Sequence, residues 1–147
     1  SFKFKPVDNK LRYSVFTNTQ LAKGGGARGG VGILNNEGNT QCVGISRIID
    51  NNNPTEVPGA SEITFSSNNI EECKSFVSWL NTKFTRFFVA INISKLGSIL
   101  TDDYFRFVPA PPSGKFDHIY TDEELYKAFN LPQEYIDVIE AVIKERK

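Results

Sequence analysis

The sequence contains no methionine, not even at position 1, and it has one histidine and two cysteines. Because a natural reading frame starts with methionine, we expect this chain to be a processed or excised piece of a longer protein. The single histidine, His118, excludes a histidine-rich zinc site and argues against a Ser-His-Asp triad. We expect Cys42 and Cys73 to be reduced thiols in the core of a cytoplasmic protein.

Long apolar stretches are also absent. No run approaches the roughly 18 apolar residues that a membrane span needs. Residues 1–6 lack the apolar segment of a signal peptide, so we expect a cytoplasmic protein with no membrane partner. The 147 residues fit a single domain, and a hydrophobic content of 39% is enough to bury a core.

Net charge is absent as well, since 17 basic side chains balance 17 acidic ones, which is unusual for a DNA-binding domain. The distribution along the chain is uneven. Basic side chains are in excess over residues 1–47 and 74–115, and acidic ones over 48–73 and 116–147. If the fold brings the two basic blocks together, they form a face that can approach phosphates. Otherwise the alternating charge simply solvates the surface.

Short segments rich in β-branched and aromatic residues, separated by glycine, asparagine and proline, predict strands. They lie at 13–17, 31–34, 41–46, 61–66 and 104–108. Apolar residues at three- and four-residue steps predict one long helix over 69–92. Because sequential short strands favour antiparallel pairing, we predict an α+β fold with a mostly antiparallel sheet and the long helix packed on it.

The C-terminal part of the chain predicts a pair of helices. Thr121 and Glu124 form a capping box that opens a short helix to about Phe129. Pro132 then suits the first turn of a second helix. We therefore expect a single domain over 1–147, with an α/β core over 1–115 and a C-terminal helical tail over 116–147.

Two apolar stripes supply the predicted core. On the long helix, the side chains expected to be largely buried are Phe76, Leu80, Phe84 and Phe87. On the last helix, they are Ile136, Ile139, Ala141, Val142 and Ile143.

Four cations are candidate DNA contacts. Lys23 and Arg28 belong to a loop with five glycines in seven positions, 24–30. The loop lacks the ending of a phosphate-binding P-loop and the spacing of a dinucleotide site. It is either a simple hairpin loop or one that lets both cations reach a DNA backbone or groove edge. On the long helix, Lys83 and Arg86 share a flank with Trp79; they either lay their stems over its ring or form a basic ridge that touches phosphates.

Asp50 with the triplet 72–74, Glu-Cys-Lys, matches part of a restriction-nuclease metal site. The triplet is common by chance, and it falls at a predicted helix start, whereas the two metal-binding acids would have to converge on a strand. We therefore predict no metal site and no nuclease activity in this chain.

Several motifs near the C-terminus resemble the C-terminal region of Eco57I-like adenine-specific DNA methyltransferases, which belong to type II restriction-modification systems. The matching segments are 105–109 (FRFVP), 120–126 (YTDEELY), 130–131 (NL), 134–136 (EYI) and 139–140 (IE). Residues 80–87 (LNTKFTRF) resemble the helix just before that tail, and the glycine-rich segment near Lys23 has a looser counterpart. The resemblance covers most of the chain and is sharpest over about 76–145.

The resemblance implies that the catalytic domain lies upstream, in a larger protein. That domain carries an Asn/Asp-Pro-Pro-Tyr/Phe motif, which holds the flipped adenine, and an S-adenosylmethionine site. Here Ala110 and Ser113 flank the Pro111-Pro112 pair, so the motif is absent. We expect no enzymatic activity and no cofactor in this chain, with S-adenosylmethionine bound by the parent protein. The C-terminal region of related enzymes looks like a target-recognition domain, which would hold the duplex while the upstream domain extracts the base.

The leading hypothesis is therefore a DNA target-recognition or DNA-clamping domain. It would contact double-stranded DNA through Lys23, Arg28, Lys83 and Arg86, beside the upstream methyltransferase domain of the same polypeptide. The alternative hypothesis is an interaction module that packs on the methyltransferase or nuclease domain without touching DNA. An independent enzyme is a third hypothesis.

Overall fold

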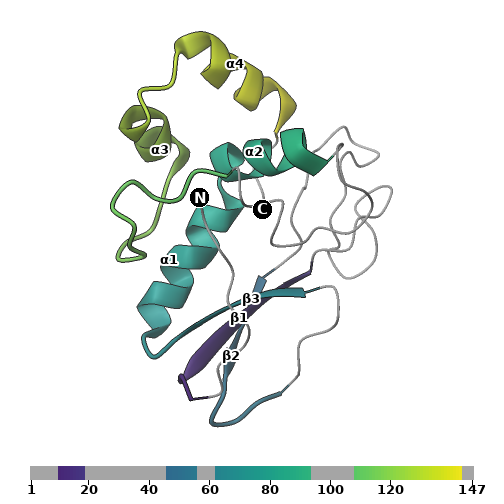
Figure 1. Cartoon of the computed structure of the whole chain (residues 1–147), viewed down its shortest axis with the longest axis vertical. Helices are drawn as coiled ribbons and strands as arrows, with labels where there is room; N and C mark the ends of the chain where they lie inside the picture. Colours follow the sequence, from purple (N-terminus) through teal and green to yellow (C-terminus); the bar gives the residue numbers. More distant parts are fainter. Residues whose placement is uncertain (1–9, 19–45, 56–61, 94–107, 144–147) are drawn as a thin grey trace.

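The computed structural model describes residues 10–18, 46–55, 62–93 and 108–143. Over these residues the fold is α+β, as predicted, with a three-stranded antiparallel sheet and four helices (Figure 1). The strands are β1 (Tyr13–Asn18), β2 (Ser46–Asp50) and β3 (Glu62–Ser67), and the helices are α1 (Ile70–Asn81), α2 (Lys83–Ile93), α3 (Asp122–Ala128) and α4 (Gln133–Val142).

The first strand is the centre of the sheet. The strand order is β2-β1-β3, and Tyr13 lies opposite Asp50 on β2 and opposite Ser67 on β3. Val15 and Phe16 of β1 are buried. β1 is rich in aromatic and β-branched residues, which fit a strand that is paired on both sides.

The predicted strands at 13–17 and 61–66 are confirmed to within one residue at each end. The predicted strand at 41–46 ends too early, because β2 begins at Ser46 and continues to Asp50. Residues 41–45 and the predicted strands at 31–34 and 104–107 lie outside the described residues. Val108 is described, and it is buried but does not belong to a strand.

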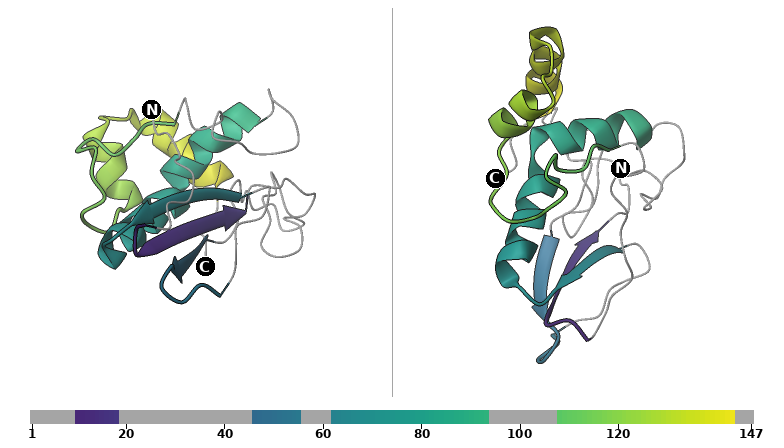
Figure 2. Two further views of the ribbon diagram at one scale, coloured as in Figure 1. Left: turned by 60° about the horizontal axis from the view of Figure 1, so that its bottom comes forward. Right: turned by 60° about the vertical axis from the view of Figure 1, so that its left-hand side comes forward.

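The helix predicted over 69–92 is present, but it is interrupted at Thr82, which divides it into α1 and α2. α1 packs against β1 and β3, whereas α2 contacts α3 and α4. Figure 1 and the right-hand view of Figure 2 show the consequence: α3 and α4 lie at the end of the molecule opposite the sheet, with α2 between.

The helix starts follow the capping residues of the sequence. Asn69 Oδ1 accepts a hydrogen bond from Glu71 N at the start of α1. Thr121 Oγ1 accepts one from Glu124 N at the start of α3, which confirms the predicted cap. Each contact satisfies an amide that has no partner within its own helix.

Phenylalanine side chains form much of the core between the sheet and α1. Phe76, Leu80 and Phe84 are buried as predicted, whereas Phe87 is half-buried. Phe76 stacks on Phe65 of β3, with ring centroids 4.5 Å apart. None of the helices in the described part of the chain has the length and apolar character needed to cross a membrane.

Candidate interaction surface

Thr82 separates Trp79 on α1 from Lys83 and Arg86 on α2. Its N–H and Oγ1 both donate to Trp79 O, which ends α1. The same Oγ1 accepts a hydrogen bond from Thr85 N at 3.1 Å, which begins α2. One threonine therefore caps two helices. The continuous helical flank predicted for Trp79 and Lys83 is therefore interrupted at Thr82.

Arg86 lies inside the protein, with 1% of its surface exposed. Its Nε donates to Asn81 O at 3.1 Å and to Thr82 O at 3.3 Å. The carbonyl groups at a helix C-terminus carry partial negative charge, so the guanidinium stabilises the end of α1. This burial does not support the predicted contact between Arg86 and a phosphate.

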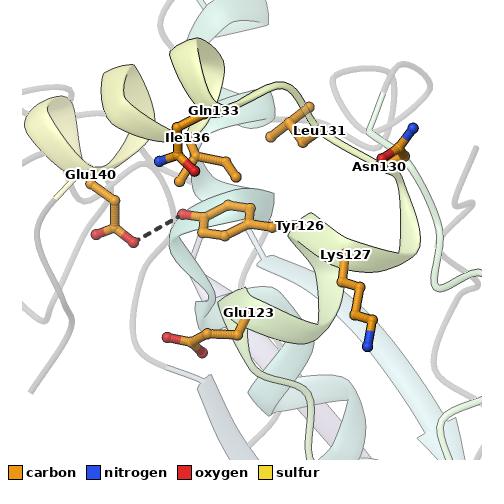
Figure 3. A pocket seen from close by; sticks show the side chains of 8 residues that line it. All are labelled: Glu123, Tyr126, Lys127, Asn130, Leu131, Gln133, Ile136 and Glu140. Atoms are coloured by element: carbon orange, nitrogen blue, oxygen red, sulfur yellow. Dashed lines mark hydrogen bonds between the residues drawn. The ribbon is translucent and has the colours of Figure 1, made fainter.

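Lys83 extends from the start of α2 toward α4. Its Nζ lies 2.5 Å from Glu140 Oε2, and the two side chains are 20% and 41% exposed. Tyr126 OH of α3 donates to the other oxygen, Glu140 Oε1, at 3.2 Å (Figure 3). The Glu140 carboxylate therefore joins α4 to both α2 and α3.

Asp122, the first residue of α3, adds a second link to α2. Its Oδ1 accepts a hydrogen bond from Phe84 N at 2.9 Å, so α3 supplies a partner for an amide in the first turn of α2. Burial raises the pKa of Asp122, while the Phe84 hydrogen bond and the Lys83 charge oppose that rise. Burial also raises the pKa of Tyr126. Two acidic groups of the helical tail, Glu140 and Asp122, thus interact with the charge of Lys83.

The described residues therefore do not show the four candidate DNA contacts gathered on one basic face. Lys23 and Arg28 lie outside the described residues. Lys83 and Arg86 both lie on α2, but each makes the protein contacts given above. The described ranges contain eight lysine and arginine residues and eleven aspartate and glutamate residues.

The partial nuclease motif is engaged in other contacts. Arg12 donates to both carboxylate oxygens of Asp50 at 3.1 Å, and this hydrogen bonding lowers the pKa of Asp50. Lys74 pairs with Glu71 at 3.5 Å. Within the described ranges, no three His, Cys, Asp or Glu side chains gather in a way that could hold a metal ion.

Cys73 is a buried free thiol, as predicted, and Cys42 lies outside the described residues. Burial raises the pKa of Cys73 to about 11. At neutral pH the thiol is therefore protonated and a weak nucleophile.

The outward face of α4 exposes a stripe of large apolar side chains. Tyr135, Val138 and Val142 are 54%, 46% and 45% exposed. Their spacing of three and four residues places them along one line of the helix. Glu134 and Asp137, both exposed, lie on the acidic flank of this stripe.

The inward face of α4 carries the packing. Ile139 and Ile143 are buried as predicted, whereas Ile136 is half-buried. The predicted burial of Ala141 and Val142 is wrong, because both are exposed. The apolar arc of α4 is wider than its contact with α2 and α3 requires. A second three-and-four periodicity, starting at Tyr135, was the sequence feature that could have indicated this.

A groove of about 460 Å³ opens between α3 and α4 (Figure 3). Its lining consists of Glu123, Tyr126, Lys127, Asn130, Leu131, Gln133, Ile136 and Glu140. The α4 residues of this lining are on a different side of the helix from the apolar stripe. The groove and the stripe are therefore separate surfaces.

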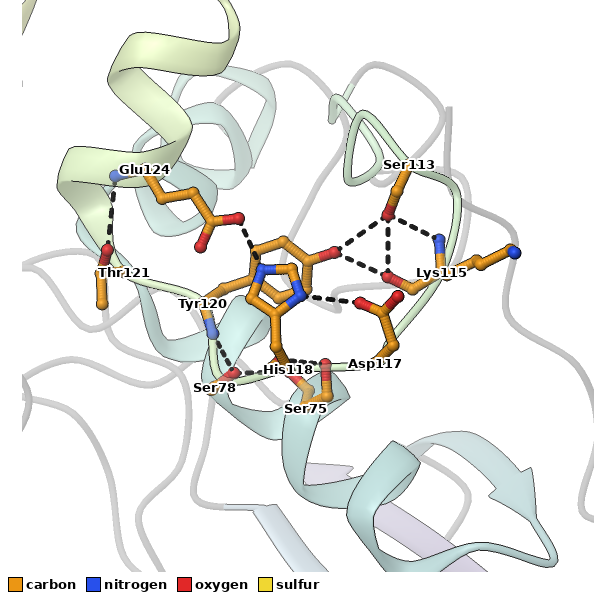
Figure 4. Close-up of polar contacts among 9 residues, drawn as sticks. All are labelled: Ser75, Ser78, Ser113, Lys115, Asp117, His118, Tyr120, Thr121 and Glu124. Carbon is orange, nitrogen blue, oxygen red and sulfur yellow. Dashed lines mark hydrogen bonds and ion pairs between the residues drawn. The ribbon is translucent and has the colours of Figure 1, made fainter.

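The single histidine bridges two carboxylates. His118 Nδ1 lies 2.7 Å from Asp117 Oδ1, and its Nε2 lies 2.5 Å from Glu124 Oε2 (Figure 4). Hydrogen bonding to these two acids raises the pKa of His118, and the same contact lowers the pKa of Asp117. Ser113 Oγ contacts Tyr120 OH and the Lys115 backbone. Since carboxylates face both ring nitrogens, the imidazole is not arranged to activate a serine.

No family model, curated protein or solved structure matches this chain.

Proposed function

We propose that this chain is an interaction module whose C-terminal helices, α3 and α4, dock on a partner domain. The exposed stripe of Tyr135, Val138 and Val142 carries this proposal. Contiguous apolar side chains beside an already buried helix face are typical of protein contact sites. An amphipathic helix with such a stripe typically binds in an apolar groove on its partner.

Charge indicates the chemistry of the partner. The stripe is flanked by Glu134 and Asp137, and the tail over 116–147 has eight acidic and four basic side chains. A complementary partner offers an apolar strip with lysine or arginine along one edge. The upstream methyltransferase domain implied by the sequence resemblance is the partner we propose, in the same polypeptide.

We therefore prefer the interaction module, which was the alternative hypothesis from the sequence, to DNA target recognition, which was the leading one. Lys83 is paired with Glu140 and Arg86 is buried, so two of the four proposed DNA contacts have other partners. A DNA target-recognition role remains a second proposal, and it now depends on Lys23 and Arg28.

Hydrogen exchange can test the docking. We expect the amides of α4 to exchange more slowly in the intact polypeptide than in the isolated chain, because the partner covers the helix. Val138→Asp should abolish this difference, since it places a charge in the apolar contact.

Ile119→Asp is the matched control, because Ile119 is 59% exposed but lies outside α4. It should leave the protection of α4 unchanged. Equal exchange of α4 in the isolated chain and the intact polypeptide would show that the stripe is not a docking surface.

A further inference from the structure

His118 connects two elements of the fold, α1 and α3. Its backbone carbonyl accepts a hydrogen bond from Ser75 Oγ of α1, and Tyr120 N donates to Ser78 Oγ of the same helix at 2.9 Å. The backbone at 118–120 is therefore fixed to α1. The imidazole reaches in the other direction, to Glu124 of α3 (Figure 4).

Both ring nitrogens face a carboxylate oxygen, which sets the protonation state that fits the geometry. A neutral imidazole has one N–H, so it can donate to Asp117 or to Glu124 but not to both. The imidazolium has two N–H groups and satisfies both acids at once. The ring is also held by Tyr120, with centroids 4.1 Å apart.

We propose that His118 is a pH-responsive clamp, closed when its imidazolium bridges Asp117 and Glu124 and open when the ring loses a proton and releases one of them. In the closed state, the ring ties the N-terminal turn of α3 to the backbone that α1 holds. In the open state, the N-terminal turn of α3 loses this tie, while Leu125 and Tyr126 keep the helix on the core. The clamp adjusts the mobility of α3 and does not determine the fold.

The charged groups around the ring define the pH window. Asp117 and Lys115 belong to the same segment as His118, Glu124 comes from α3, and α1 contributes the hydroxyl groups of Ser75 and Ser78. The pKa of His118 is raised above 6.5, so the stabilisation is complete below that pH and is lost as pH rises through the folded value. The pKa of Asp117 is lowered below 3.8, so its contribution is present above that pH and is lost under stronger acid. The clamp is therefore closed at mildly acidic pH and opens as pH rises through the folded pKa of His118.

The test uses the fact that the chain has one histidine. In the full chain, the Cε1–Hε1 NMR signal reports His118 without overlap from another imidazole. We expect a midpoint above 6.5 in the unmodified chain. Glu124→Gln and Asp117→Asn should each lower the midpoint by about half a pH unit or more, because each removes a negative charge from the ring.

Glu123→Gln is the matched control. Glu123 precedes Glu124 on α3 and is exposed, and the contacts of the His118 ring are to Asp117 and Glu124. This variant should shift the midpoint clearly less than Glu124→Gln does. A midpoint at or below 6.5 in the unmodified chain, or equal shifts in the Glu123 and Glu124 variants, would overturn the proposal.

A second measurement separates a clamp from a histidine that merely titrates. Amide exchange in α3, corrected for the intrinsic pH dependence and referenced to α1, should rise about twofold or more as pH passes the His118 midpoint. In His118→Gln the same ratio should show no step. If the ratio in the unmodified chain is flat through the midpoint, the bridge does not control α3. This readout needs no partner domain, so it is independent of the docking proposed above.

Discussion

Lys83 and Glu140 are 57 positions apart in sequence, and their charged groups meet at 2.5 Å between α2 and α4. The same carboxylate accepts a hydrogen bond from Tyr126 OH. A lysine predicted to face DNA phosphates is thus a link between the core of the domain and its last helix.

This ion pair should be measurable in a double-mutant cycle. Lys83→Ala, Glu140→Ala and the double variant should give a coupling energy of about 0.5–1 kcal/mol, the upper part of the range for exposed pairs, because Lys83 is largely covered. Urea unfolding gives the three free energies. The pair of Lys74 and Glu71 on the surface of α1 is the control, and its coupling should be smaller. Equal coupling in the two cycles would show that the Lys83 pair does not hold α4 in place.

Phe84→Ala tests the attachment of the tail through apolar contact. Phe84 is buried, and its ring stacks on Phe129 with centroids 5.3 Å apart. Deleting the ring should lower the free energy of unfolding by about 3–5 kcal/mol if the site cannot collapse. Phe87→Ala should cost less, because Phe87 is half-buried. A loss under about 1 kcal/mol for Phe84→Ala in denaturant unfolding would mean that this face is an exposed interface.

Arg86 should be needed for stability in a way that lysine cannot replace. Arg86→Ala leaves the Asn81 and Thr82 carbonyls without their charged donor, and we expect a loss of about 2–3 kcal/mol in unfolding free energy. Arg86→Lys should recover little of it, because the ammonium has no equivalent of the Nε–H at that position along the side chain. Full recovery of stability by lysine would show that charge alone matters here.

The fold class, two of the strands and the caps at Asn69 and Thr121 follow from local sequence, because alternation and capping are local properties. The break at Thr82 was harder to predict. The apolar three-and-four spacing continues through it, since α1 and α2 each bury one face. Threonine is a favoured N-cap residue, so Thr82 was the one sign in the sequence that a new helix could begin there. The hydrogen bond from Thr85 N to Thr82 Oγ1 shows that it does.

The partners of the charged residues could not be predicted, because they depend on tertiary contacts. Nothing near Lys83 in sequence indicates Glu140, and Arg86 bonds the end of the preceding helix only because Thr82 turns the chain. The exposure of Val142 has a similar cause: its helix is apolar over a wider arc than α2 and α3 cover. The contact between His118 and Glu124 could be predicted only in part: the capping-box glutamate follows the histidine by six positions, but whether the two side chains meet depends on the path of the backbone between them.

DNA binding, if it occurs, should depend on Lys23 and Arg28, because Lys83 is paired with Glu140 and Arg86 is buried. In the longer polypeptide that we propose, Lys23→Ala should weaken binding to specific and random duplexes alike and lower the salt slope by about one unit, as expected for a lost phosphate contact. Arg28→Ala should cost roughly 1–3 kcal/mol on the cognate site alone if its glycine neighbours let it read a base edge. Lys83→Ala should leave the salt slope unchanged, because its charge is paired with Glu140.

Salt-dependent titrations of these three variants against the parent protein separate the two proposals. If Lys23→Ala and Arg28→Ala bind specific and random duplexes as tightly as the parent at low salt, contact with DNA through the glycine-rich loop is wrong. The docking role of α3 and α4 then stands alone. If Lys83→Ala instead lowers the salt slope by a full unit, Lys83 must leave Glu140 when DNA binds, because a lysine held by a carboxylate releases no counterion from a phosphate. That result would also predict faster amide exchange in α4 on DNA binding, since the helix would lose its link to α2.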